Sequence, residues 1–209
     1  MRLILVRHGE TVWNAERRLQ GHADAPLSER GQEQARRAAA FFAAEPPPGL
    51  VVTSDLGRAR RTAEILGFTG AETDPRLREM DLGEWTGRYI SDIEAEDRYA
   101  YRDWRLGRLT PPGGETWEAF RARVGAAISD VIARAQDDAV IVTHEGVVRA
   151  ACDLLVGLAP ASLAPLSPCA ITVFAVNRTV SPATARLLTF NCVSSPADLK
   201  SRGLDHAPV

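Results

Sequence analysis

The chain has 209 residues, enough for one well-filled hydrophobic core but too few for two domains of comfortable size. With 45% hydrophobic and 25% charged residues and a net charge of −2, nothing favours a nucleic-acid or an acidic-membrane partner. No run reaches the roughly 18 apolar residues of a membrane span, and the N-terminal run is too short for a signal-peptide core, so we expect a cytoplasmic protein.

Hydrophobic periodicity and turn residues predict alternating strands and helices. The first strand, residues 3–6, is four apolar residues in a row, typical of a strand buried on both faces. Further strands are predicted over 50–54, 71–73, 139–143, 170–176 and 185–191. Helices are predicted from Glu10, from Ser28 to about residue 45, from a Ser54 or Asp55 cap to about residue 66, and over 90–101, 115–135 and 145–155.

This alternation predicts an α/β fold, a three-layer sandwich in which helices flank a mostly parallel central sheet. We expect a single domain over residues 1–209, with a loose tail from Pro196. The charged and aromatic segment 86–118 is interpreted as a cap-like insertion. It would form a small helical cap over the carboxyl edge of the strands, where ligands bind in open α/β sheets.

Polar residues follow three of the predicted strands. Arg7 and His8 follow the first, Ser54-Asp55 the second, and His144 the strand over 139–143. Arg58 lies one turn into the next helix, where a cation opposes the helix dipole unless an anion is bound. Each residue alone has an ordinary interpretation as a surface charge or a strand-end histidine. Their occurrence together at one sheet edge favours a functional site.

The residue types at this edge suit phosphoryl transfer. Two arginines can hold the non-bridging oxygens of a phosphoryl group in a fixed orientation. An imidazole among cations is driven toward its neutral, nucleophilic form. Glu79 lies in a segment too polar for a core; it is either a loop carboxylate or an acid that protonates the departing alkoxide and then activates water. Such chemistry needs no metal ion.

The chain also resembles the histidine phosphatase superfamily, in the branch of cofactor-dependent phosphoglycerate mutases and small-molecule phosphatases. The motifs that carry the resemblance span residue 4 to about residue 150: RHGET at 7–11, RLQGHADAPL at 18–27, SDLGRARRTA at 54–63, LREMDLGEW at 77–85 and THEGVVR at 143–149. The resemblance implies that His8 is a phosphohistidine nucleophile and Glu79 the proton donor. The rest of the phosphate pocket would be Arg7, Arg58 and His144. Asn14 and Gln20 match positions that reach the phosphate or the substrate. We also place Gly21 and Glu145 among the residues expected to bind the substrate or its phosphate.

Two departures from the family pattern bear on the substrate. Glu145 stands where family members often have glycine, and its carboxylate argues against strongly anionic substrates. Mutases continue with Arg-His-Tyr-Gly after the proton donor, whereas Met80-Asp81-Leu82-Gly83 follows here, the phosphatase-like form. The resemblance therefore implies a phosphoric monoester hydrolase of the histidine acid phosphatase type, metal-independent and acting on a small soluble phosphorylated metabolite. A cofactor-dependent phosphoglycerate mutase and a non-catalytic phosphate-binding scaffold are the alternatives.

Remaining features concern packing and partners. The spacing of Cys152, Cys169 and Cys192 resembles no metal-ligand motif; we predict reduced core residues and expect neither a metal nor a cofactor. The strand over 170–176 could be an edge that pairs in a homodimer. Aromatic residues of the cap segment suit either packing or the ring of a sugar, and we favour packing for Tyr89, Tyr99, Tyr101, Trp104 and Trp117.

Overall fold

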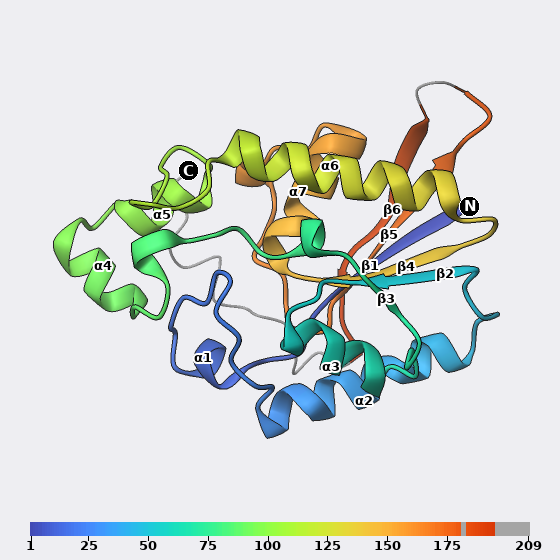
Figure 1. The fold of residues 1–209 in the computed structure, drawn as a ribbon, viewed down its shortest axis with the longest axis horizontal. Helices are drawn as coiled ribbons and strands as arrows, with labels where there is room; N and C mark the ends of the chain where they lie inside the picture. The colour runs from blue at the N-terminus through green and yellow to red at the C-terminus, as the bar shows by residue number, and fades with distance from the viewer. Residues whose placement is uncertain (181–182, 195–209) are drawn as a thin grey trace.

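A computed structural model describes residues 1–180 and 183–194 and contains one six-stranded sheet (Figure 1). The strands are β1 (Arg2–Arg7), β2 (Leu50–Thr53), β3 (Glu72–Thr73), β4 (Ala139–Thr143), β5 (Ile171–Asn177) and β6 (Thr184–Cys192). Their order is β3-β2-β4-β1-β5-β6, and the first four strands of this order are mutually parallel, whereas β5 and β6 are antiparallel to their neighbours. The predicted α/β fold with a mostly parallel sheet is confirmed.

Helices cover both faces of the sheet, which gives the predicted three layers (Figure 1). On one face lie α2 (Glu29–Ala43) and α3 (Gly57–Ile65), and on the other α6 (Trp117–Arg134) and α7 (Glu145–Val156). The alternation of side chains along a strand explains this arrangement. Ile4 and Val6 of β1 belong to the core cluster under α2 and α3, and Leu3 and Leu5 to the cluster under α6 and α7.

Beyond the carboxyl ends of the parallel strands lie two short helices, α4 (Ile90–Glu96) and α5 (Ala100–Arg105) (Figure 1). The prediction of one continuous helix over 90–101 is wrong. Asp97 is extended, and its carboxylate accepts a hydrogen bond from the Tyr99 backbone N–H at 2.8 Å, a local turn that separates the two helices. The treatment of 86–118 as an insertion into a single domain stays a prediction.

Most aromatic residues of this cap serve packing. The rings of Trp104 and Trp85 meet edge-on with centroids 6.2 Å apart, and Tyr101 lies against Trp104 at 5.6 Å. Trp117 packs against Phe120 at 5.7 Å. The packing interpretation is thus confirmed for Tyr101, Trp104 and Trp117. Tyr89 and Tyr99 are exposed and lie outside the core; Arg18 lies over the Tyr89 ring at 5.3 Å, and Arg102 lies over the Tyr99 ring at 4.5 Å.

The remaining elements are single turns: α1 (Val12–Ala15) and the 3-10 helices η1 (Pro75–Leu77), η2 (Gly83–Trp85) and η3 (Pro160–Ser162). In α1, the Thr11 hydroxyl accepts from the Asn14 N–H at 3.1 Å and the Asn14 side chain accepts from the Thr11 N–H at 3.2 Å. This capping box satisfies the main-chain N–H groups of Thr11 and Asn14 at the start of α1.

Two further expectations need correction. Neither Ser54 nor Asp55 caps α3; the N-cap position is Leu56, and the distant Asp24 carboxylate accepts from the N–H groups of Gly57 and Arg58. β5 is not an edge strand, because it pairs with β1 on one side and β6 on the other. A homodimer cannot form by pairing along β5, although dimerisation through another surface stays a prediction.

The cysteines divide between core and surface. Cys152 and Cys169 are buried, as predicted, but Cys192 is exposed because it ends β6 at the sheet edge. The predicted tail from Pro196 lies outside the described residues. Within the part of the chain that is described, no helix is long and apolar enough to cross a lipid bilayer.

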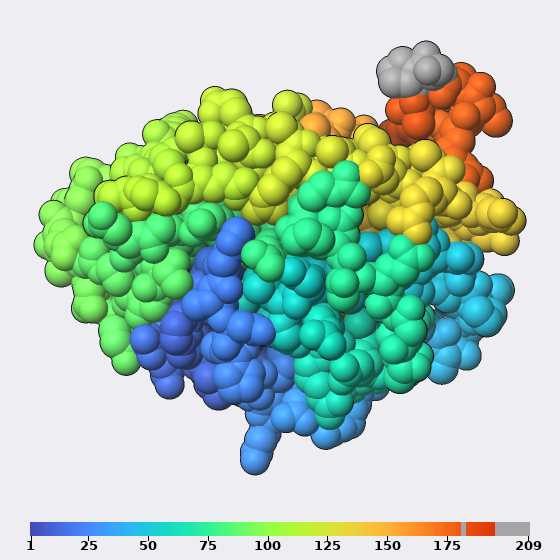
Figure 2. Space-filling view, in the orientation of Figure 1, coloured from blue at the N-terminus to red at the C-terminus, as the bar shows by residue number. Residues whose placement is uncertain are grey.

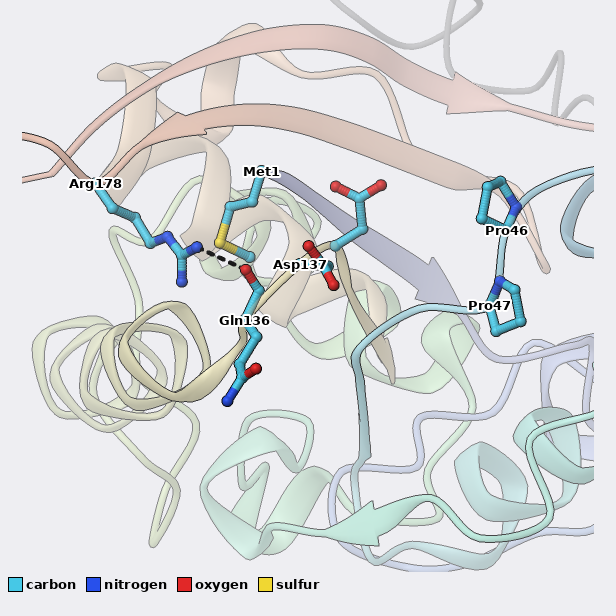
Figure 3. A pocket seen from close by; sticks show the side chains of 7 residues that line it. Met1, Pro46, Pro47, Gln136, Asp137 and Arg178 are labelled. Atoms are coloured by element: carbon cyan, nitrogen blue, oxygen red, sulfur yellow. Dashed lines mark hydrogen bonds between the residues drawn. The ribbon is translucent and has the colours of Figure 1, made fainter.

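A hollow opens at the amino ends of β1 and β4 (Figure 3). The Arg178 guanidinium spans part of it and donates to the Gln136 carbonyl at 2.9 Å. This hollow lies at the end of the sheet opposite to the polar strand ends that follow Arg7 and Thr143. It is lined by Met1, Pro46, Pro47, Gln136, Asp137, Asp138 and Arg178.

Candidate active site

The sheet register brings the polar strand ends together. Arg7 of β1 lies opposite Thr143 of β4, and the His8 N–H donates to the Thr143 carbonyl at 2.8 Å. The imidazoles of His8 and His144 therefore leave neighbouring strands side by side, with ring centroids 5.2 Å apart. On the other side of β4, the Ser54 N–H donates to the Val142 carbonyl at 3.0 Å. The predicted convergence at the carboxyl edge is confirmed.

One hydrogen bond determines the tautomer of His8. Its Nδ1 lies 2.7 Å from the Gly9 carbonyl oxygen. A carbonyl oxygen can only accept, so in the neutral ring Nδ1 must carry the proton. The lone pair of the neutral imidazole is then on Nε2, the atom that a nucleophilic role requires.

Arg58 is a buried cation held by main-chain oxygens. Its two terminal nitrogens donate to the carbonyls of Ala23 at 2.7 Å and Gly21 at 2.8 Å, while Nε is buried with no hydrogen-bond partner. Burial lowers the pKa of Arg58 to about 10, partly offset by Glu79 and Asp24. The guanidinium stays charged at neutral pH and presents an unsatisfied donor, which an anion would satisfy.

Arg7 is held in a similar way from one side. Its Nη1 donates to the Leu166 carbonyl and lies 3.1 Å from Glu145 Oε2. Its Nε, like that of Arg58, is buried without a hydrogen-bond partner. Both arginines therefore combine anchored terminal nitrogens with a buried donor that still lacks an acceptor.

His144 supplies a third such nitrogen. Its Nε2 lies 2.9 Å from the Ser54 hydroxyl, and its Nδ1 is buried without a hydrogen-bond partner. Burial, reinforced by the charge of Arg58 and by His8 and Arg7, holds the pKa of His144 well below 6.5. The ring is thus neutral at pH 7. When Nε2 accepts from the serine hydroxyl, Nδ1 carries a proton that it can donate to a ligand.

The carboxylate of Glu79 lies at the start of α7. Glu79 Oε1 accepts from the Met80 N–H at 2.9 Å, and Oε2 accepts from the Gly146 N–H at 3.1 Å. Gly146 comes two residues after His144 in the chain, so its bond to Oε2 holds the Glu79 carboxylate close to the end of β4. Asp81, another carboxylate close to Glu79 in the sequence, instead accepts from the Gly83 N–H at 3.0 Å and lies 4.0 Å from His22.

Asn14, in α1, and Gln20 and Gly21, in the loop after it, lie between β1 and α2. The Asn14 amide oxygen is used by the Thr11 cap, which leaves its NH2 group for a ligand. Gln20 is buried and its Oε1 has no hydrogen-bond partner. In Figure 2 the N-terminal part of the chain, in blue, reaches the surface between the cap and the segment that carries α3, and Arg18 Nε donates to the Gly87 carbonyl at 2.9 Å.

Glu145 contacts two arginines. Its Oε1 accepts from Arg105 of α5 at 2.6 Å, and its Oε2 lies 3.1 Å from Arg7. Although burial raises it, the charges of Arg105 and Arg7 hold the pKa of Glu145 far below its ordinary value. Glu145 therefore links Arg105 of the cap to Arg7 at the end of β1 instead of standing alone.

Several residues that shape the site were missed from sequence. Arg105 and the carbonyl of Leu166 reach the site from segments with no motif, and the capping role of Asp24 was not anticipated. Their partners lie 40, 159 and 34 positions away, so local spacing carries no signal of them. No group of three or more His, Cys, Asp or Glu within the described residues could hold a metal ion.

Known proteins of similar sequence include two described as probable phosphoglycerate mutase GpmB. The protein from Enterobacter sp. (strain 638) is 38% identical over 145 residues, which are 63% of each chain. The protein from Cronobacter sakazakii is 41% identical over 140 residues, 62% of each chain. The chain thus spans less than two thirds of the length of either relative.

Solved structures match over nearly the whole chain. A mycobacterial glucosyl-3-phosphoglycerate phosphatase in complex with VO3 superposes with a TM-score of 0.83 at 33% identity, covering 91% of this chain and 99% of that one. YhfR of Bacillus stearothermophilus gives 0.82 at 31% identity, covering 92% and 97%. The sequence profile of the histidine phosphatase superfamily (branch 1) matches residues 3–187, and the chain belongs to that family.

Proposed function

We propose that the protein is a metal-independent phosphomonoester phosphatase that forms a phosphohistidine at His8. The observation that carries this proposal is a set of three buried nitrogens without hydrogen-bond partners at the carboxyl edge of the sheet: Arg7 Nε, Arg58 Nε and His144 Nδ1. An unsatisfied buried donor costs about 1–3 kcal/mol. Phosphate oxygens would satisfy all three, beside an imidazole whose Nδ1–H is already engaged by Gly9.

In the first step, the lone pair of His8 Nε2 attacks phosphorus, and the bond from phosphorus to the ester oxygen breaks as the N–P bond forms. Glu79, protonated, gives its proton to the departing alkoxide. Arg7, Arg58 and His144 donate to the non-bridging oxygens and stabilise the charge that gathers there. The products are an alcohol, a phosphohistidine and the Glu79 carboxylate.

In the second step, water attacks the phosphohistidine from the side that the alcohol has left. Glu79 takes a proton from the water as the new P–O bond forms. The N–P bond breaks and its electron pair returns to Nε2, so inorganic phosphate leaves and both residues regain their starting states. Every proton in the cycle is handled by side chains of this chain.

A phosphoglycerate mutase is the second candidate, favoured by the names of the two relatives. Against it, Met80 follows Glu79, is buried and accepts a hydrogen bond from Trp104 Nε1 at 3.4 Å. The charged and phenolic groups that would hold a glycerate are missing from that position. A binding scaffold has no observation of its own in its favour, because the groups for turnover are all present.

The test measures phosphate release from p-nitrophenyl phosphate and from a panel of phosphorylated metabolites, in excess EDTA. Glucosyl-3-phosphoglycerate belongs in the panel because a solved neighbour is named for it. We expect turnover and an acid-labile phosphoenzyme, both abolished by His8→Ala. Faster interconversion of 3- and 2-phosphoglycerate than hydrolysis would identify a mutase. Loss of activity on chelation, restored by Mg²⁺, would overturn the metal-free mechanism.

A further inference from the structure

Arg123 of α6 donates three hydrogen bonds to the segment that carries Glu79 and two to Glu115. Nη1 donates to the carbonyls of Arg76 at 2.8 Å and Arg78 at 2.9 Å, and Nη2 donates to the carbonyl of Glu79 itself at 2.9 Å. Nε and Nη2 also form a bidentate pair with Glu115, both at 2.7 Å. A guanidinium has five N–H groups, and these five bonds use them all.

The held segment has little regular structure of its own. It joins η1 to η2, and Arg78 has an extended backbone. Glu115, the partner of Arg123, also binds the residues that follow Glu79. Its Oε2 lies 3.4 Å from the Asp81 N–H, and its own N–H donates to the Asp81 carbonyl at 2.9 Å. The Phe120 ring lies 4.7 Å from the Arg123 guanidinium carbon, so the cation rests on a buried aromatic residue.

We propose that Arg123, braced by Glu115, is a positioning residue that holds Glu79 where it exchanges protons with the leaving oxygen and with water. The proposal rests on the proposed acid–base role of Glu79. Arg123 does not reach the phosphoryl group in this role; it fixes the main chain from residue 76 to residue 79. Because a shift of about 1 Å in a reacting group can cost about 10²-fold in rate, a loosened segment would slow proton transfer in particular.

Charge and geometry can be separated at this position. The positive charge of Arg123 also helps to lower the pKa of His144, so removing the charge would disturb the phosphate pocket as well. Lysine keeps the charge but has a single nitrogen with three donors, and cannot hold three carbonyls and a bidentate carboxylate. Arg123→Lys therefore tests positioning with the electrostatic contribution largely retained.

The experiment compares kcat and KM for an alkyl phosphate, whose alkoxide needs a proton, with those for p-nitrophenyl phosphate, which does not. For Arg123→Lys we expect kcat on the alkyl phosphate to fall about 10- to 100-fold, a smaller loss on p-nitrophenyl phosphate, and little change in KM. Arg121→Lys is the matched control. It lies on the same helix, its Nε pairs with Asp153 at 2.6 Å, and it should leave both substrates unaffected.

A double variant shows whether the effect passes through Glu79. In the Glu79→Gln background, Arg123→Lys should add no further dependence on the leaving group. Equal losses on both substrates, or an undiminished effect in that background, would overturn the proposal. If Glu79→Gln alone shows no leaving-group dependence, the acid role of Glu79 fails instead. Should Arg123→Lys fold poorly, Glu115→Gln provides the same comparison with the three carbonyl contacts retained, and we expect the same pattern at smaller size.

Discussion

The N–H of Gly146 donates to Glu79 Oε2 at 3.1 Å, and a Cβ atom on Gly146 would lie only 2.1 Å from Glu79 Oε1. Gly146 is the second residue of α7, a position where the backbone does not require glycine. Glycine is required there because the Glu79 carboxylate occupies the space of a side chain. The Glu79 carboxylate and the helix that follows His144 are thus fitted to each other.

Gly146→Ala should displace Glu79 and lower kcat on alkyl phosphates about 10²-fold. Alanine favours a helix over glycine by roughly 0.5–1 kcal/mol, so the free energy of unfolding should not fall in parallel with activity. Steady-state kinetics and thermal unfolding of the same variant check this. Gly125→Ala in α6 is the control, because its Cβ would meet Leu154 at an ordinary 3.4 Å. Wild-type kcat in Gly146→Ala would contradict a tightly placed Glu79.

Glu79→Gln should cripple hydrolysis of sugar and alkyl phosphates by about 10² to 10⁴ while sparing p-nitrophenyl phosphate relatively well. The amide cannot donate a proton to an alkoxide, whereas p-nitrophenolate leaves nearly unaided. The measurement is kcat across leaving groups of graded pKa. Asp81→Asn is the control, since Asp81 faces Gly83 and His22. A leaving-group pattern in Asp81→Asn instead would mean that the wrong carboxylate has been assigned.

Arg58→Lys should restore little of the activity lost in Arg58→Ala. The guanidinium spans the carbonyls of Ala23 and Gly21 and still has its Nε donor, a fork that an ammonium cannot reproduce. We expect kcat to fall and KM to rise in both variants, because the donor acts in ground and transition states alike. Arg61→Lys, an exposed position on the same helix paired with Glu64, should behave as wild type. Full activity in Arg58→Lys would show that the fork is irrelevant.

Because of the buried His144, the folded protein should lose stability against unfolding as the pH falls. Its pKa in the folded protein is held well below 6.5, first by burial and then by Arg58, so the unfolded chain takes up a proton that the folded one does not. The free energy of unfolding should then fall below about pH 6.5, by up to about 1.4 kcal/mol per pH unit, and His144 should contribute no slope above it. Urea unfolding in phosphate-free buffer measures the slope, which should be smaller in His144→Asn. Equal slopes would show that His144 titrates alike in both states.

The strand ends were predictable because they depend on short-range pattern. An apolar run such as residues 3–6 indicates a buried strand, and parallel neighbours bring their carboxyl ends to one edge whatever the loops do. Arg7, His8 and His144 were therefore found together from the sequence. The break at Asp97 was missed because an aspartate carboxylate that accepts from an N–H two residues on competes with an otherwise helical charge pattern.

The supports of the site could not be predicted in the same way. Arg123 reaches the carbonyls of residues 76–79 from more than 40 positions away, and Arg105 reaches Glu145 from the cap. Nothing in the spacing of these arginines distinguishes them from the solvated arginines of α2. The strand over 170–176 was wrongly predicted to lie at an edge for a related reason. Its own residues do not show that β6, later in the chain, pairs with it on the outer side.

Many contacts that hold the reactive groups are to main-chain oxygens. Gly9 engages His8, Gly21 and Ala23 anchor Arg58, and Leu166 anchors Arg7. Every amino acid offers the same carbonyl, so the contacts that Ala23 makes with Arg58 and Leu166 makes with Arg7 do not depend on the chemistry of the Ala23 and Leu166 side chains. Under the proposed function, such positions can adapt to a different alcohol while the main-chain oxygens that hold the two arginines stay in place.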